Sequence, residues 1–280
     1  MQVIESLTGC QNLMAALRVQ SKRIALVPTM GYLHAGHLSL IQAAKNKADF
    51  VVVSIFVNPL QFAQNEDLSS YPRDLAGDFK KVEQTGADAL FLPDLASFYP
   101  PQFQTFVEVT QLSQGLCAKT RPTHFRGVTT VVMKLLHIVQ PHDLWLGEKD
   151  FQQVRVLEQM VADLAIPVAV CRGATLRDTD GLALSSRNVY LSPNEREHAL
   201  VLFKILEKIK ESVKLGERCV SLLIAQGQAL LATVADARLD YLVIVNEGSL
   251  LEESQVGPFS RALIAVFIGR TRLIDNMRLM

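Results

Sequence analysis

The sequence predicts an α/β protein in which a doubly wound parallel sheet is followed by a smaller C-terminal α+β domain. Apolar runs of strand length alternate with segments of helical periodicity over residues 1–175. The run Phe50 to Val57 is almost entirely β-branched or aromatic, which is typical of a parallel strand covered on both faces. The alternation stops after Tyr190, so we expect a second domain at residues 176–280.

The elements of the first domain follow from apolar spacing and from proline and glycine positions. In the sheet they form, ligands bind beyond the carboxyl ends of the strands, which is where the unusual polar residues of this chain occur. The predicted elements are a helix at 10–20, a strand at 24–27, a turn at 28–31, a helix from Gly36, a strand at 50–57, a helix at 73–85, a strand at 87–92, an irregular loop at 95–103, a helix at 124–139, a strand at 143–146, a helix at 150–164 and a strand at 167–171.

The second domain is predicted to contain two helices and two strands. Ser192 and Glu195 have the spacing of a capping box, with Pro193 at the first helical position, and they open a helix that continues to about residue 215. A second helix is expected at 217–235, followed by strands at 239–245 and 262–268.

Composition narrows the class of protein. The chain has 280 residues, 49% apolar and 20% charged, which is ordinary for a globular protein of one or two domains. The 28 basic and 28 acidic residues balance, which argues against a broad nucleic-acid surface or an anionic-membrane surface. The four cysteines form no Cys-x-x-Cys pair, and no secretory segment or membrane span is apparent, so we expect a cytoplasmic protein.

The segment from Ile24 to Leu38 is predicted to be a strand, a tight loop and the start of a helix. His34 and His37 lie at that helix start, where unpaired N–H groups favour anions and phosphate above all. Three alternatives remain open. The pair could belong to a nucleotide phosphate site, ligate a metal or be merely structural. Gly31 and Gly36 have the glycine spacing of a Walker A loop, but His37 replaces its lysine, and the His-Glu-x-x-His spacing of a zinc pair is absent.

Other polar residues also follow predicted strands. Asn58 and Gln61 carry neutral amides that suit the hydroxyl and carboxylate groups of a small substrate, or else they form an Asn-Pro turn with a solvated glutamine. Lys149 can add positive charge at a second helix start. Asp150 could instead be a plain N-cap, with Gln153 as its capping-box partner.

Two further polar segments lie in predicted loops. Leu184 to Asn188 combines two hydroxyls and a guanidinium, which can close over phosphates and stabilise a leaving pyrophosphate, or it is a polar linker. The segment that contains Arg121, His124 and Arg126 is basic, and its role stays open.

Five ordered blocks and a closing segment resemble those of one family, the pantoate–β-alanine ligases or pantothenate synthetases, essentially from end to end. The histidine block alone resembles the wider nucleotidyltransferase superfamily with its His-x-Gly-His signature. Leu176, where valine is common, is a small departure. The blocks are Pro28-Thr-Met-Gly-x-Leu-His-x-Gly-His37, Ser54-Ile-Phe-Val-Asn-Pro-x-Gln-Phe62, Tyr71-Pro-Arg-Asp74, Gly147-Glu-Lys-Asp-x-Gln-Gln153, Asp180-Gly-Leu-Ala-x-Ser-Ser-Arg-Asn188 and the closing Thr271-Arg-Leu-Ile-Asp-Asn276.

The resemblance implies a Rossmann-like first domain that binds nucleotide and pantoate, a C-terminal lid domain and a homodimer. It implies that ATP and pantoate form pantoyl adenylate with release of pyrophosphate, that β-alanine then displaces AMP, and that Mg²⁺ accompanies the ATP phosphates. Gln61 would contact pantoate and β-alanine, Gln153 would contact pantoate, and Asn58 would join this substrate site. The implied ATP contacts are Met30, Gly31, Tyr32, Leu33, His34, Ala35, Gly36, His37, Gly147, Glu148, Lys149, Asp150, Leu176, Leu184, Ser185, Ser186 and Arg187.

The chemistry of adenylate formation agrees with these residues. Attack by a carboxylate on the α-phosphorus brings two anions together and moves charge onto pyrophosphate, so hydrogen-bond donors and cations should line the site. By the resemblance His37 is the proton donor. The other expected catalytic groups are His34, Lys149, Ser185, Ser186 and Arg187. These groups are expected to converge on a single triphosphate, and no protein metal ligand is assigned.

Two other functions remain open. A nucleotidyltransferase acting on a phosphate monoester would share the histidine site, but its acceptor pocket should carry extra Arg or Lys, where this chain offers amides such as Asn58 and Gln61. A nucleotide-sensing regulator would not require both the histidine pair and the Ser-Ser-Arg loop. Pantoate-dependent exchange of labelled pyrophosphate into ATP separates these possibilities.

Overall fold

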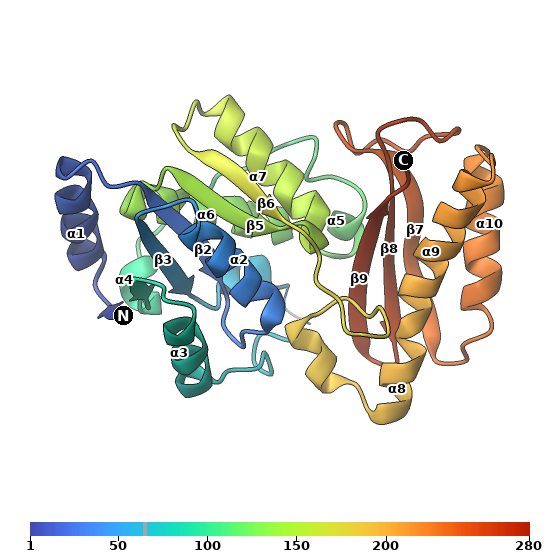
Figure 1. Cartoon of the computed structure of the whole chain (residues 1–280), viewed down its shortest axis with the longest axis horizontal. Helices are drawn as coiled ribbons and strands as arrows, with labels where there is room; N and C mark the ends of the chain where they lie inside the picture. The colour runs from blue at the N-terminus through green and yellow to red at the C-terminus, as the bar shows by residue number, and fades with distance from the viewer. Residues whose placement is uncertain (64–65) are drawn as a thin grey trace. The chain divides into compact units, whose positions relative to one another are not determined.

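The computed structural model describes residues 1–63 and 66–280, which form two compact units (Figure 1). Unit 1 comprises Met1–Glu148 and Gln153–Ala174, and unit 2 comprises Lys149–Gln152 and Thr175–Met280. Among the described residues, unit 1 contains a six-stranded parallel sheet and unit 2 a three-stranded antiparallel sheet. The predicted fold class, a doubly wound parallel sheet with a smaller α+β domain, is therefore confirmed.

The sheet of unit 1 has the strand order β1-β4-β3-β2-β5-β6. The order reverses between β2 and β5, since the chain moves from β2 to β3 and β4 on one side and from β5 to β6 on the other. A reversal of this kind defines the position where ligands bind in open α/β sheets. The strands are β1 (Gln2–Ile4), β2 (Ile24–Thr29), β3 (Phe50–Ile55), β4 (Ala89–Phe91), β5 (Asp143–Gly147) and β6 (Ala169–Gly173).

Helices cover both faces of this sheet. The helix α2 packs on β2, β3 and β5 and also contacts α3, whereas α1 contacts α6, which packs on β2. In Figure 1, α2 lies across the near face of β2 and β3. The helical segments are α1 (Leu7–Val19), α2 (Ala35–Lys45), the 3₁₀ helix η1 (Pro59–Gln61), α3 (Leu75–Gln84), α4 (Leu95–Phe98), α5 (Cys117–Thr120), α6 (His124–Val139), the 3₁₀ helix η2 (Glu148–Asp150) and α7 (Phe151–Asp163).

The strand β2 is longer than predicted, since Pro28 and Thr29 belong to it and the turn begins only at Met30. The carbonyl of Thr29 faces β3, where it accepts the Phe56 N–H at 3.0 Å. Because the direction alternates along a strand, residue 28 faces β5, and the pairing of β2 with β5 is recorded only at Ala25 and Leu26. A proline is therefore tolerated in this central strand because its missing N–H lies beyond the β5 ladder.

Two other predictions for unit 1 were incomplete. The region predicted as an irregular loop at 95–103 begins with α4, which Asp94 caps by accepting the Ser97 N–H at 2.9 Å. The strand β1 was not predicted, because three residues that pair only with β4 are too short to show an alternating pattern.

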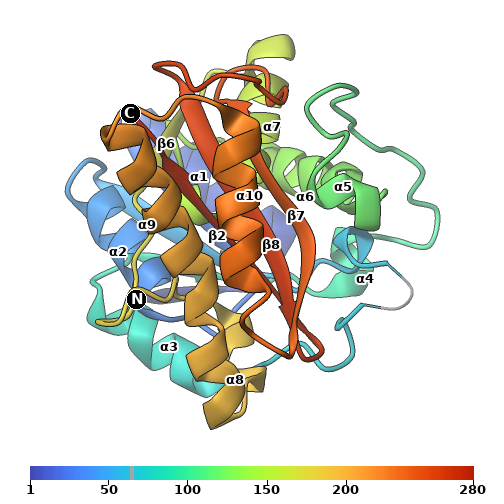
Figure 2. The same ribbon diagram turned by 90° about the vertical axis from the view of Figure 1, so that its right-hand side faces the viewer.

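Unit 2 is a three-stranded antiparallel sheet in the order β7-β8-β9, covered on one face by α9 and α10 (Figure 2). Its core is formed by apolar residues from these helices and strands, among them Ile205 and Leu223 from the helices and Ile264 from the sheet. The elements are the 3₁₀ helix η3 (Ser186–Tyr190), α8 (Pro193–His198), α9 (Leu200–Lys214), α10 (Val220–Leu231), β7 (Ala237–Asn246), β8 (Ser260–Ile268) and β9 (Thr271–Arg278).

The single helix predicted from Ser192 to about residue 215 is two helices. The predicted capping box is present at Ser192 and Glu195, but α8 ends at His198 and α9 begins at Leu200. The side chains of α8 pair with polar partners, Arg196 with two aspartates and His198 with Asp236, whereas α9 buries an apolar face. The strand β9 was not predicted either, because its buried positions include polar residues that hide the strand pattern.

The start of β5 carries a buried ion-paired carboxylate. Asp143 is fully buried, accepts two bonds from the Arg23 guanidinium at 2.6 and 2.8 Å, and lies 3.0 Å from Lys47 Nζ. Burial alone would raise the pKa of this carboxyl, but the hydrogen bonds from Arg23 and Lys47 outweigh it and hold the pKa below its ordinary value. A lowered pKa stabilises the folded state above the unfolded-state pKa and ceases to do so as the pH falls through the folded-state pKa.

We therefore expect Asp143→Asn to lower the free energy of unfolding at neutral pH and to weaken its decrease on acidification from about pH 7 to about pH 3. Urea denaturation across this range measures both effects. Asp163→Asn, at the exposed end of α7, is the control and should leave the pH dependence unchanged. An unaltered pH dependence in Asp143→Asn would contradict the assignment.

Candidate active site

The turn after β2 is held by a buried carboxylate from α3. Asp78, 1% exposed, accepts the N–H groups of Tyr32 and Leu33, each at 2.7 Å. Tyr32 has a left-handed backbone with φ +50°, which is strained for a residue with a side chain and persists only where its surroundings fix it. Lys81, one turn further along α3, donates to the Leu33 carbonyl at 2.8 Å.

The two histidines cap the helix α2 that this turn introduces. The Nδ1 of His34 accepts the Gly36 N–H at 3.2 Å, and the Nδ1 of His37 accepts the His34 N–H at 3.3 Å, so the pair forms a capping box. Because Nδ1 is the acceptor in both rings, the neutral rings carry their hydrogen on Nε2. Both half-buried rings therefore have an Nε2–H donor at the positive end of α2, with ring centroids 4.1 Å apart.

The glycine between the histidines is required by the fold of this motif. A Cβ on Gly36 would lie 2.9 Å from Cε1 and 3.0 Å from Nδ1 of His34. In the structure the His34 ring occupies that space, so the structural alternative for the histidines explains Gly36.

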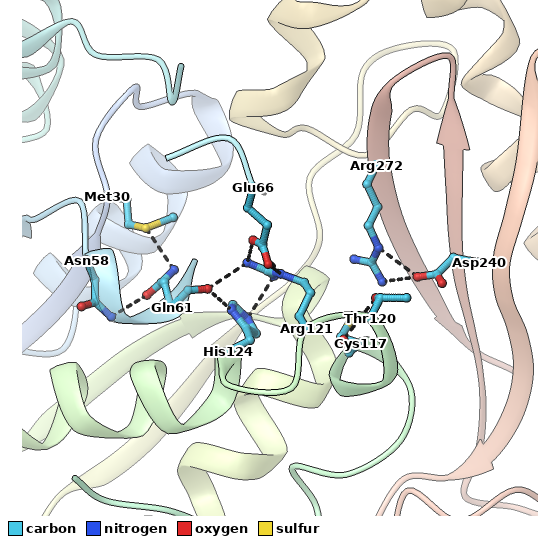
Figure 3. A network of polar contacts seen from close by, with 10 residues as sticks. All are labelled: Met30, Asn58, Gln61, Glu66, Cys117, Thr120, Arg121, His124, Asp240 and Arg272. Atoms are coloured by element: carbon cyan, nitrogen blue, oxygen red, sulfur yellow. Dashed lines mark hydrogen bonds and ion pairs between the residues drawn. The ribbon is translucent and has the colours of Figure 1, made fainter. Parts of the chain in front are cut away.

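The two amides after β3 are buried and lie in one chain of hydrogen bonds (Figure 3). Asn58 Nδ2 donates to Gln61 Oε1 at 3.0 Å, and Gln61 Nε2 lies 3.0 Å from the sulfur of Met30. Asn58 does form the Asn-Pro turn, since its Oδ1 accepts the Leu60 N–H at 3.3 Å, but the alternative of a solvated glutamine is wrong because Gln61 is 8% exposed.

The hydroxyl of Tyr99 fixes the direction of this chain. It donates to Asn58 Oδ1 at 3.0 Å, and burial raises the pKa of the Tyr99 phenol, so the hydroxyl stays protonated. Asn58 must therefore donate through Nδ2, Gln61 must accept through Oε1, and Gln61 Nε2 points a donor toward Met30. A thioether is a weak acceptor, so an oxygen-bearing ligand can replace it.

The basic loop whose role the sequence left open binds the backbone of Gln61. Arg121 donates to the Gln61 carbonyl at 3.1 Å, and the Nδ1 of His124 lies 2.9 Å from the same oxygen (Figure 3). Arg121 is itself held by Glu66 through bonds of 2.7 to 2.9 Å. Arg126 differs, because its guanidinium stacks on the Phe106 ring at 4.9 Å. Arg121 and His124 therefore position Gln61 from outside the amide chain.

Three other predicted residues lie in unit 1. Gly147 ends β5 opposite Gly173, and Glu148 lies 3.7 Å from the Arg172 guanidinium. Gln153 is half-buried in the first turn of α7.

The remaining predicted ATP contacts belong to unit 2. Ser185 caps η3 by accepting the Arg187 N–H at 3.3 Å, and Ser186 is buried. The Leu184 N–H donates to the Leu176 carbonyl at 3.0 Å, so these two residues are paired across a narrow loop. The segment predicted as a loop thus contains a short 3₁₀ helix with a capped start. Lys149, whose carbonyl accepts from Asn276, is half-buried, and Asp150 is exposed.

The predicted site residues therefore form two groups. Residues 30–37, Asn58 and Gln61 are joined by the contacts of unit 1, and Leu176 and 184–187 by those of unit 2. The convergence of the two groups on one nucleotide stays a prediction.

Sequence reasoning missed the residues that hold these groups in place. Asp78 is buried, but it belongs to an amphipathic helix with many charged residues, so the sequence alone suggests that its side chain is exposed to solvent. Tyr99 lies in an aromatic loop, and Asn276 lies in a strand that had not been predicted. Only the segment with Arg121 and His124 gave a signal, as a cluster of basic residues.

The six-stranded parallel sheet, with the His-x-Gly-His segment at a helix start, places the chain in the Rossmann-like fold class. The family model described as Pantoate-beta-alanine ligase matches residues 2–278. A pantothenate synthetase of Syntrophomonas wolfei subsp. wolfei is 46% identical over 278 residues, which cover 99% of each chain. The crystal structure of pantothenate synthetase from Thermus thermophilus has a TM-score of 0.95 and 42% identity and covers 100% of this chain and 99% of that one.

A solved pantoate-beta-alanine ligase from Francisella tularensis, described as complexed with beta-gamma ATP and beta-alanine, has a TM-score of 0.83 and 34% identity over 99% of this chain and 97% of that chain. The chain belongs to the pantoate–β-alanine ligase family and is a ligase of pantothenate biosynthesis. Among the described residues, no helix is both long enough and apolar enough to cross a membrane.

The close approach of α6 to η1 predicts a defined effect of adding one methyl group. A Cβ on Gly127 would lie 2.3 Å from the Leu60 carbonyl oxygen and 2.6 Å from the Gln61 nitrogen. We expect Gly127→Ala to lower the free energy of unfolding by about 1–3 kcal/mol, because backbone must move to accept it. Urea denaturation measures the loss. Gly257→Ala, whose Cβ would meet nothing closer than 4.0 Å, is the control, and equal stability of both variants would contradict this interpretation.

Proposed function

We propose that the protein condenses (R)-pantoate with β-alanine to pantothenate at the expense of ATP, through a pantoyl-adenylate intermediate and with release of AMP and pyrophosphate. Family membership supports this reaction, and the Francisella tularensis relative binds an ATP compound and β-alanine according to its description. The observation that carries the proposal is the capping box of α2, which directs two Nε2–H donors at the positive end of a helix.

In the first step the pantoate carboxylate attacks the α-phosphorus of ATP and pyrophosphate leaves. His34 and His37 donate hydrogen bonds to phosphate oxygens, and His37 supplies the proton as charge develops on the leaving group. Lys149, Ser185, Ser186 and Arg187 contribute further donors on the same nucleotide. The adenosine and phosphates are bound by residues 30–37, 147–150, Leu176 and 184–187.

Pantoate is held by amides. The donor of Gln61 that lies against the Met30 sulfur turns to a pantoate oxygen when the substrate binds, because an oxygen is the better acceptor. Gln153 adds a second amide, and Asn58 holds Gln61 Oε1 in place. Gln61 also contacts β-alanine in the second step.

In the second step the amine of β-alanine attacks the acyl carbon of the adenylate and AMP leaves. The adenylate is a mixed anhydride that water would hydrolyse, so a C-terminal domain at 176–280 that closes over residues 1–175 keeps it dry. No group on the enzyme needs to become acylated, because the nucleotide itself activates the carboxylate.

The proposal includes Mg²⁺, a homodimer and a cytoplasmic location. The described residues contain no group of three or more His, Cys, Asp or Glu side chains placed to hold a metal ion. In the proposed reaction Mg²⁺ accompanies ATP and binds through its phosphates, whose negative charge it offsets.

We expect His37→Ala and Lys149→Ala each to slow adenylate formation by on the order of 10²-fold or more while leaving the fold intact, since each removes a donor to the transition state. Pantoate-dependent exchange of labelled pyrophosphate into ATP and single-turnover release of pyrophosphate measure this step. His137→Ala, an exposed histidine of α6, is the control. Unchanged pyrophosphate release in His37→Ala or Lys149→Ala would refute the assignment.

Gln61→Ala should raise the KM for pantoate while ATP binding survives, because it removes the amide that contacts the acid substrate and no proposed contact with ATP. Exchange assays at varied pantoate, with ATP binding measured by calorimetry, separate the two. Gln159→Ala, on the exposed part of α7, is the matched control. Equal loss of pantoate and ATP binding would indicate a folding defect and contradict the role.

A further inference from the structure

The segment Lys149–Gln152 belongs to unit 2, although the residues before and after it in the chain belong to unit 1. Two contacts attach it there. The ring of Phe151, 1% exposed, lies 4.1 Å beneath the Arg261 guanidinium, and the Lys149 carbonyl accepts from Asn276 Nδ2 at 2.9 Å. Lys149 is thus fixed through its backbone by residues of β8 and β9.

The amide of Asn276 has one consistent orientation. Arg261 donates from Nη1 to Asn276 Oδ1 at 2.6 Å, and a guanidinium can only donate. The Nδ2 of Asn276 must then face the Lys149 carbonyl, which can only accept. Asn276 therefore links a fixed cation to the backbone of Lys149, and no other natural side chain of its length can donate and accept in this way.

The linkage rests on a rigid, buried platform. Arg261 is also held by Glu247 at 2.7 Å, and the Asn276 N–H is held by Asp275, which pairs with Arg177 through two bonds. Asp275 and Asn276 are each 4% exposed. Buried polar networks stabilise a strand no better than apolar packing would, so their presence in β9 calls for another explanation.

We propose that Asn276 is a positioning residue that sets the place of Lys149 for adenylate formation. The proposal rests on the proposed function, in which Lys149 donates to the nucleotide. A lysine side chain is flexible, so its ammonium group is positioned precisely only if its backbone is held in place. A displacement of about 1 Å at a catalytic group can lower the rate by up to 10²-fold. The polar network of β9 supplies that fixed start.

Asn276→Asp and Asn276→Ser test the proposal by two different changes. The aspartate keeps its bond with Arg261 but sets an oxygen against the Lys149 carbonyl, so that two acceptors face each other. The serine removes the contact without adding charge. We expect both to slow pantoate-dependent pyrophosphate exchange by about tenfold or more, with the KM for pantoate and the Tm near those of the parent protein. Asn246→Asp, the same change at the end of β7, is the control and should leave the rate unchanged.

A double-mutant cycle with Lys149→Ala distinguishes positioning from a general structural effect. If Asn276 acts through Lys149, the Asn276 variants lose their effect in the Lys149→Ala background, measured at higher enzyme concentration. The proposal is overturned if the rate factors of the Asn276 and Lys149 substitutions multiply in the double mutant. It is also overturned if both Asn276 variants keep the parent rate or if both fail to fold. If Lys149→Ala alone leaves the exchange rate unchanged, the role of Lys149 in the proposed function fails, and the inference fails with it.

Discussion

The carboxylate of Asp78 is the contact on which the first half of the site depends. It holds two consecutive N–H groups, those of Tyr32 and Leu33, at the point where the chain leaves β2 and turns toward α2. A left-handed residue with a side chain costs on the order of 1–3 kcal/mol, and the two short bonds to a buried anion offset that cost. The histidines that follow can cap α2 only because this turn delivers them to its first residues. The left-handed Tyr32 and the buried carboxylate of Asp78 therefore both maintain the same turn between β2 and α2.

Each unit fixes a residue of the proposed site by its main-chain carbonyl. Arg121 and His124 contact the carbonyl of Gln61, and Asn276 contacts the carbonyl of Lys149. In each case the partners lie far away in the chain and are themselves held by ion pairs, Arg121 by Glu66 and the neighbour of Asn276 by Arg177. Contacts of this kind fix the backbone from which the side chain starts without using its terminal atoms. They also explain why polar residues are buried at positions where apolar ones would suffice for folding.

Periodicity and cap signals predicted the main elements of unit 1, and the boundaries of the helix from His124 to Val139 agree with the structure. Short or polar strands were not predicted. β1 has too few residues to show an alternating pattern, and the buried Asp275 and Asn276 interrupt the apolar alternation of β9. The motif residues His34, His37, Asn58 and Gln61 were identified because each follows a strand, and the first two cap a helix as well. Asp78 could not be identified in this way, because the sequence does not show which charged residue of an amphipathic helix is buried. The need for glycine at position 36 became clear only in the structure, where the His34 ring lies 2.9 Å from the place that a Cβ would take.

The proline in β2 has a consequence for how the sheet opens at its carboxyl edge. Pairing between β2 and β5 is recorded up to Leu26 and Leu144, yet both strands continue beyond that point. Any other residue at position 28 would point its N–H toward β5 beyond the last paired residues. That N–H would then need water or another acceptor as its partner. Pro28 has no N–H to present there, so this end of the strand pair carries no amide donor from position 28 that would compete for a ligand. The end of β2 thus lacks one N–H donor, whereas the start of α2, a few residues later, carries several.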